Sequence, residues 1–214
     1  MRSLDDVVRS GKVLYVGISD TPSWVISSAN TMAHLRGWSP FIALQTRYNL
    51  LDRSYEFDHA AMVADFGLTS VAWGAIAEGF LSGKYKKGIH TAGESRPTVA
   101  AHLADDRNWD ILNEVVKIAG EINRTPAQVA INWLLRKGVN PLIGARTVEQ
   151  LKDNIGALEF ALTKEQVASL DAVSKPKSVP FGSFAYNRER QVMFSKFIDS
   201  GFKIQFPPQY QTLL

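Results

Sequence analysis

The chain has 214 residues, of which 45% are hydrophobic and 21% are charged, a balance typical of a soluble globular protein. It carries 24 basic and 21 acidic side chains, with a net charge of only +3, and no Lys/Arg stripe with interleaved aromatics, so nucleic-acid binding is not expected. The absence of cysteine excludes disulfides, thiolate catalysis and Cys-based metal centres. No signal peptide and no run approaching the ~18 apolar residues of a membrane span occurs, which predicts a cytoplasmic protein without membrane contact.

Four apolar, β-branched runs predict buried strands. They are nearly continuous rather than alternating, as expected of strands that are covered on both faces in a parallel sheet. A segment with helical features follows each of them, so the chain consists of repeated strand–helix units. The runs cover residues 13–19 (VLYVGIS), 41–45 (FIALQ), 69–76 (TSVAWGAI) and 141–145 (PLIGA).

Capping signals and apolar spacing predict the helices. After the first run, Asp20-Thr21-Pro22 offers an N-cap with a proline near the first helical position. Thr125-Pro126-Ala127-Gln128 combines a capping box with an early proline. The glycines between 79 and 97 instead predict an irregular loop. Further helices are predicted over residues 54–66, 109–122 and, in the C-terminal extension, about 187–197. Two more helices are predicted to begin at a second capping box, residues 147–150, and at residue 163.

The repeated strand–helix order predicts a parallel α/β fold. A closed (β/α)8 barrel requires eight such units, whereas this chain shows about four, within residues 1–175. We therefore predict a parallel (β/α) partial TIM barrel, followed by a C-terminal extension over 176–214. Four strands leave two unpaired edges, which promote association. Since two copies could pair edge to edge into eight strands, we expect a homodimer or another compact oligomer.

The residues that follow each strand are candidates for a binding site, because ligands of such folds lie at the carboxyl ends of the strands. Ser19 and Gln45 could hydrogen-bond a planar amide, and Trp73 could stack on a ring. The glycine turn at Gly144, together with Arg146 and the next helix N-terminus, could hold a phosphate. Each position also has a purely structural interpretation, as a core residue or a helix cap.

Two sharper motifs are excluded by their spacing. Residues 79–85 (GFLSGKY) have three residues between the glycines where a P-loop has four, and Tyr85 replaces the required Ser or Thr. No metal site is predicted, because metal-ligand spacing is absent among the four histidines, His34, His59, His90 and His102.

Several segments of the chain resemble the C-terminal half of the aldo-keto reductases. They are RSGKVLYVGIS, FIALQTRYNLLDR, the strand ending in Trp73 with its LSGKY loop, TPAQVAINWLL and IGARTVEQLKDNIGALEF, in order within residues 1–175. The resemblance implies a barrel that binds NADP(H) in an extended form. The nicotinamide would be held by Ser19, Asp20, Gln45 and Trp73. The diphosphate would be lined by Gly74, Ile76 and Lys84, and the 2′-phosphate and adenine would be bound by Gly144, Arg146, Thr147, Gln150 and Asn154.

The chain departs from the family pattern in three ways. Asp20 stands where the family usually has Asn, and Gly74-Ala75-Ile76 stands where it usually has Ser-Pro-Leu. In addition, the family's catalytic tetrad of Asp, Tyr, Lys and His belongs to the first four βα units, and no counterpart of these residues is recognised here. Carbonyl reduction needs a proton donor beside the carbonyl oxygen, so we expect negligible reductase activity from this chain alone.

Four hypotheses about function remain open. The chain could be a truncated aldo-keto reductase-like protein that descends from an NADP(H)-type oxidoreductase. It could be a non-redox enzyme, such as a cyclase, isomerase or dehydratase, that uses the old cofactor cleft. It could also be a fragment of an ordinary NADPH-dependent carbonyl reductase, or a non-catalytic binding module. The candidates for acid–base work in the second case are Asp20, Arg47, Tyr48 and Glu78.

Overall fold

The computed structural model describes residues 1–88 and 97–176. The helix predicted near 187–197, nearly all of the predicted C-terminal extension and part of the loop predicted between 79 and 97 lie outside these residues. Within them, no helix is both long enough and apolar enough to span a membrane.

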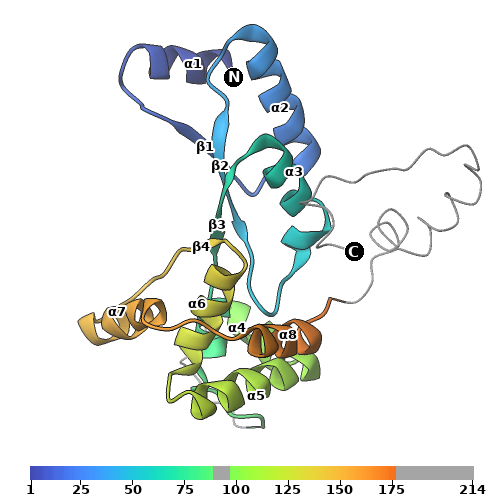
Figure 1. Cartoon of the computed structure of the whole chain (residues 1–214), viewed down its shortest axis with the longest axis vertical. Coiled ribbons are helices and arrows are strands. Elements are labelled where there is room, and N and C mark those ends of the chain that lie inside the picture. The colour runs from blue at the N-terminus through green and yellow to red at the C-terminus, as the bar shows by residue number, and fades with distance from the viewer. Residues whose placement is uncertain (89–96, 177–214) are drawn as a thin grey trace, which may run out of the picture.

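Four parallel strands form one sheet, in the order in which they occur along the chain (Figure 1). They are β1 (Val16–Ser19), β2 (Phe41–Arg47), β3 (Thr69–Trp73) and β4 (Asn140–Pro141). The predicted fold, a parallel α/β partial barrel, is confirmed. Within the described ranges β1 and β4 have one neighbour each, so each leaves one edge unpaired.

The fourth strand is shorter than predicted. Only Asn140 and Pro141 pair with β3, and the last contact of this segment with the sheet is Leu142 N–H donating to Ala72 O at 2.7 Å. The prediction of a strand over 141–145 is therefore wrong. Pro141 has no N–H to donate, and no described strand lies on the outer side of β4 to hold the following residues in a ladder.

The helices occupy most of the remaining described chain. The segment predicted as one helix over 54–66 is divided at Asp58, whose φ of −147° interrupts the helical backbone. The α-helices are α1 (Arg2–Arg9), α2 (Ser23–Arg36), α3 (His59–Phe66), α4 (Pro97–Leu103), α5 (Asp106–Glu121), α6 (Pro126–Arg136), α7 (Val148–Ile155) and α8 (Lys164–Val173). Three short 3-10 helices are η1 (Ser54–Phe57), η2 (Ala77–Ser82) and η3 (Gly156–Leu158).

The predicted caps are formed to different degrees. At α6 both bonds of the capping box between Thr125 and Gln128 are present, which confirms that prediction. At α7 the hydroxyl of Thr147 accepts from the Gln150 N–H, but the side chain of Gln150 accepts from the Arg146 N–H instead of closing a box. At α2 the N-cap position is Pro22 and no side chain caps the helix, since the Asp20 carboxylate accepts from Trp73 instead. The predicted capping box of α7 and the predicted side-chain cap of α2 are therefore wrong.

The core lies where the helices after β3 pack against the sheet. Its largest fully buried side chains include Trp133 and Leu134 of α6, Ile111 of α5 and Phe80 of η2. Figure 1 shows α5, α6 and α8 gathered at the β4 end of the molecule, with α1 and α2 at the β1 end. The loop that follows β3 is therefore anchored in the core, because Phe80 and Leu81 of η2 are fully buried.

Candidate functional site

The carboxyl ends of β1 and β3 are joined by Asp20 and Trp73. The indole N–H of Trp73 donates to both carboxylate oxygens of Asp20, at 2.9 and 3.1 Å. Asp20 has a φ of 45°, in the left-handed region that Asp and Asn tolerate better than most residues. The guanidinium carbon of Arg47 lies 5.2 Å from the centroid of the Trp73 ring, so the ring is held at its edge and on one face.

Arg47 also belongs to a polar cluster at the end of β2. Its Nη1 and Nη2 each lie 3.3 Å from a carboxylate oxygen of Glu78, and its Nε lies 3.3 Å from Asp52. His102 of α4 completes the cluster, with Nε2 2.8 Å from Glu78 Oε2. The sequence offered no spacing signal for His102, because α4 brings it to the sheet from 24 residues beyond Glu78.

The loop after β3 has an unusual backbone. Gly74, Ala77, Glu78 and Gly79 all have positive φ, at 70°, 48°, 54° and 96°. Gly74 O accepts the side-chain N–H of Asn49 at 2.9 Å and the backbone N–H of Ala77 at 2.8 Å. The left-handed φ favours glycine at position 74, which gives a structural reason for the departure from the Ser of the family pattern.

A cavity of about 650 Å³ lies between this loop and the segment after β4, within the size range of small-molecule sites. Of the twelve residues predicted to bind the cofactor, eight line it: Trp73, Gly74, Ile76, Lys84, Gly144, Arg146, Gln150 and Asn154. Four do not, namely Ser19, Asp20, Gln45 and Thr147. Trp73 belongs both to the cavity and to the cluster at the strand ends, so it connects the two parts of the candidate site.

Arg146 and Lys84 supply positive charge to the cavity. In the part of the chain that the structure describes, the guanidinium of Arg146 has no hydrogen bond or ion pair, and its side-chain neighbour Gln150 binds only its backbone N–H, at 2.8 Å. The ammonium of Lys84 lies 4.9 Å from the centroid of the Tyr85 ring, without a carboxylate partner among the described residues. Both cations are therefore available to an anionic ligand.

The N-terminus of α7 is partly satisfied by its own residues. Hydrogen bonds from the Glu149 backbone N–H and the Thr147 hydroxyl lower the pKa of the Glu149 carboxyl, so a carboxylate already lies in the first turn. Asn154 is buried and donates to Gly144 O at 3.2 Å. Thr147 and Asn154 thus shape the loop around Arg146, whose guanidinium has no hydrogen-bond partner in the described part of the chain.

Tyr48 is separated from the cavity, although it follows Arg47 directly. It is 2% exposed, and its hydroxyl donates to Glu56 at 2.5 Å. Burial, reinforced by the charge of Glu56, raises the pKa of Tyr48. Of the four acid–base candidates, the structure brings Asp20, Arg47 and Glu78 to the strand ends and places Tyr48 in the core.

Comparison with known proteins identifies the family. The aldo/keto reductase family model matches residues 1–175. A protein of Saccharomyces cerevisiae named probable aryl-alcohol dehydrogenase AAD4 is 37% identical over 81% of this chain and 54% of its own length.

Two further relatives come from other fungi. The aryl-alcohol dehydrogenase [NADP(+)] of Phanerodontia chrysosporium is 32% identical over 85% of this chain and 49% of its own length. Norsolorinic acid reductase of Aspergillus flavus is 31% identical over 80% of this chain and 43% of its own length. The chain thus spans about half the length of the curated relatives it matches. On the match over residues 1–175, the chain belongs to the aldo/keto reductase family.

Proposed function

We propose that this chain is the cofactor-binding half of an NADP(H)-type oxidoreductase barrel, and that its cavity takes the phosphate-bearing part of the cofactor. The observation that carries the proposal is a pair of cations, Arg146 and Lys84, that have no ion-pair partner among the described residues and line a cavity at the carboxyl ends of parallel strands. A relative is named for NADP(+), which supports the same cofactor here.

The residues present fit such a ligand in parts. Arg146 suits a phosphate monoester, since a guanidinium donates to two phosphate oxygens at once. Arg47 lies over one face of the Trp73 ring, and Trp73 lines the cavity, where an indole can stack on a planar ring. Ser19 and Gln45 are exposed at the ends of β1 and β2. The hydroxyl of Ser19 and the amide of Gln45 could hydrogen-bond a carboxamide. When bound, NADP(H) would supply or accept a hydride.

The chemistry that this chain could complete alone is limited. Tyr48 is the tyrosine closest in sequence to the strand-end residues, and its hydroxyl is buried against Glu56. We propose that the purified chain binds the dinucleotide but reduces simple aldehydes such as 4-nitrobenzaldehyde negligibly, because no counterpart of the family's catalytic tyrosine is recognised in it and Tyr48, at the end of β2, is buried. Turnover within about tenfold of a full-length family member would overturn this second part.

Fluorescence titration tests the cofactor proposal, because Trp73 lines the cavity. NADPH should quench the tryptophan emission of the wild-type chain, and Arg146→Met should weaken NADPH binding by about tenfold to a hundredfold, the value of a charge-assisted hydrogen bond. NADH lacks the 2′-phosphate, so the wild-type chain and Arg146→Met should bind NADH with the same affinity. Arg2→Met, an exposed arginine on α1, is the control. Equal losses for NADPH and NADH would refute the phosphate assignment, and no quenching by either would refute cofactor binding.

The partner that we propose is a second copy of the chain, docked through α7 and the open edge of β4. Val148, Leu151 and Ile155 of α7 are 61%, 42% and 48% exposed, and their i, i+3 and i+7 spacing places them on one face. Burial of that face against another copy would remove apolar surface from water.

Light scattering would measure this association. The wild-type mass should be twice the 23.7 kDa of one chain, and the mass of Leu151→Glu should be that of a single chain. Val116→Glu on α5 is the matched control, because Val116 is 44% exposed but lies on a different helix. A wild-type mass of one chain would overturn the proposal.

A second candidate function is non-redox acid–base catalysis in the same cavity. The observation that favours it is Glu78, a carboxylate in the cavity lining that is hydrogen-bonded to His102. A carboxylate held by an imidazole can remove a proton from the carbon beside a carbonyl group and return it. Proton NMR in deuterium oxide should then show exchange at that carbon in dihydroxyacetone phosphate, abolished in Glu78→Gln. No exchange with the wild-type chain would argue against this function for that substrate class.

A further inference from the structure

The carboxylate of Glu78 is surrounded by nitrogen donors. Arg47 approaches it with two nitrogens, one to each carboxylate oxygen, both at 3.3 Å. His102 Nε2 lies 2.8 Å from Oε2. All three side chains are largely buried: the exposed fraction is 25% for Arg47, 13% for Glu78 and 15% for His102. The two donors therefore form a preformed anion subsite, which the protein's own carboxylate fills.

The proton on His102 can be placed from these distances. Nε2 also lies 3.3 Å from Arg47 Nη2, but a guanidinium only donates and a carboxylate only accepts. The shorter contact with Glu78 requires Nε2 to carry the hydrogen. Arg47 and His102 thus both direct N–H groups at the same point, and both would lose a partner if Glu78 moved away.

The backbone holds Glu78 in a strained position. Ala77, Glu78 and Gly79 have successive φ values of 48°, 54° and 96°, and residues with a Cβ rarely adopt this region. Lys84 approaches the same loop, because its Nζ lies 3.6 Å from where a Cβ on Gly79 would stand. A loop that stores strain can rearrange when a better partner replaces the contacts of Glu78.

We propose that Arg47 and His102 form a subsite for the diphosphate of the dinucleotide, and that Glu78 occupies this subsite until the ligand displaces it. A phosphate group accepts the paired donors of a guanidinium in the same way as a carboxylate does. This inference rests on the proposed function for the identity of the ligand. It adds two residues from β2 and α4 to the cavity lining, and it makes Glu78 an internal competitor of the cofactor.

Removal of the competing charge should strengthen binding. Glu78→Gln keeps the size of the side chain but weakens its hold on Arg47 and removes its repulsion of an anion. We expect the affinity for inorganic pyrophosphate and for NADPH to rise by about tenfold, and Arg47→Met to lower both by about tenfold. Isothermal titration calorimetry measures both ligands on the full chain. Circular dichroism shows whether each variant is folded.

Glu114→Gln is the matched control. Glu114 is also a paired glutamate, with Lys117 at 3.2 Å and a side chain that is 18% exposed, but it belongs to α5 and does not line the cavity. Its replacement should leave both affinities unchanged. An unchanged or reduced affinity of folded Glu78→Gln for pyrophosphate would overturn the subsite, and so would the absence of pyrophosphate binding in every variant.

The two ligands separate this inference from the proposed function. If pyrophosphate binds and responds to Glu78→Gln while NADPH does not bind, the subsite stands and the cofactor proposal fails. If NADPH binds and Arg146→Met weakens it, but Glu78→Gln changes neither ligand, the cofactor proposal stands and the subsite fails.

Discussion

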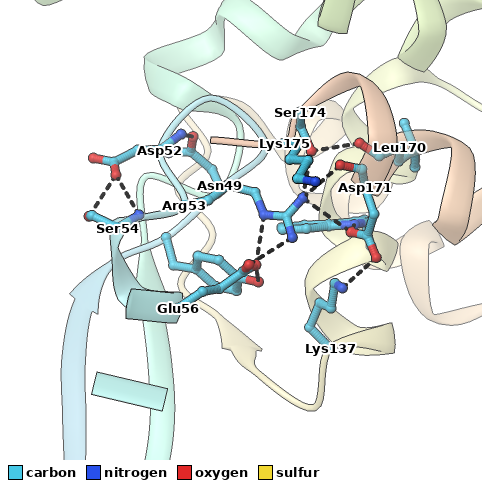
Figure 2. A network of polar contacts seen from close by, with 12 residues as sticks. Asn49, Asp52, Arg53, Ser54, Glu56, Lys137, Leu170, Asp171, Ser174 and Lys175 are labelled. Atoms are coloured by element: carbon cyan, nitrogen blue, oxygen red, sulfur yellow. Dashed lines mark hydrogen bonds and ion pairs between the residues drawn. The ribbon is translucent and has the colours of Figure 1, made fainter. Parts of the chain in front are cut away.

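Two arginines of this chain have opposite surroundings. Arg53 is enclosed by partners from its own loop and from the C-terminal end of α8 (Figure 2). Its Nε and Nη2 each donate to Glu56 at 2.7 Å, and its Nη1 donates to Ser174 Oγ at 2.9 Å and to Asp171 O at 3.1 Å. Arg146 faces the cavity with a guanidinium that has no partner among the described residues. The first arginine is saturated and the second is available.

The difference indicates what each arginine contributes. Arg53 joins the loop after β2 to α8, which lies 118 residues further along the chain at Asp171, and its guanidinium lies 5.3 Å from the buried ring of Trp133. Burial opposes its charge, but the hydrogen bonds and charge of Glu56 outweigh burial and raise the pKa of Arg53. Arg53 thus stabilises the fold, whereas the guanidinium of Arg146 has no partner among the described residues and is the group that we propose binds the ligand.

The largest expected effect is on the stability of Arg53→Met. Loss of the guanidinium leaves Glu56 and Asp171 without their buried cation. Breaking such a pair lowers the free energy of unfolding by about 3 kcal/mol, and we take this lower end of the usual range because both carboxylates are partly exposed. Urea unfolding followed by tryptophan fluorescence measures the loss. Arg146→Met is the control and should change the free energy of unfolding by less than about 0.5 kcal/mol. Equal losses in the two variants would contradict the comparison.

The sheet and the Arg146 loop could be predicted from local patterns. Continuous apolar runs identified four parallel strands, and the box at Thr125 identified the start of α6, because both signals lie within a few neighbouring residues. Of the eight predicted cofactor residues that line the cavity, Trp73, Gly144 and Arg146 were also indicated by their position near strand ends. The other five were implied by the resemblance to the aldo-keto reductases.

The remaining features depend on tertiary contacts. His102 reaches Glu78 only through the packing of α4, and Glu149 partly satisfies the α7 N-terminus that was assigned to an anion. Tyr48 could have been placed better, because Gln45 and Arg47 are two residues apart and share a face of β2. The next residue turns to the other side, where Tyr48 lies 5.2 Å from the ring of Trp133.

The second effect sharpens the comparison through pH. Burial raises the pKa of Tyr48 above its ordinary value of 10.0, so the unfolded chain loses this proton before the folded chain does. The contribution of Tyr48 to stability is therefore intact below pH 10 and is lost as the pH rises above it, by at most about 1.4 kcal/mol per pH unit. Urea unfolding between pH 9 and 11 measures the slope. Tyr48→Phe should show a shallower decline, and parallel declines would refute the linkage.

The smallest effect concerns the two threonine caps at the N-termini of α6 and α7. Thr125 makes a complete capping box and also donates to Asp153 at 3.1 Å, so Thr125→Ala should lose about 1 kcal/mol of stability. Thr147 is exposed and forms only half of a box, and Thr147→Ala should lose about 0.5 kcal/mol.

Thr147 also separates a capping role from a ligand contact. It was assigned to the cofactor by resemblance, yet it lies outside the cavity lining. If it acts only by shaping the loop around Arg146, Thr147→Ala should change the NADPH affinity by no more than about twofold, far less than Arg146→Met. A tenfold loss in the fluorescence titration would instead make the Thr147 hydroxyl a ligand contact, because a small change in cap stability cannot weaken binding that strongly.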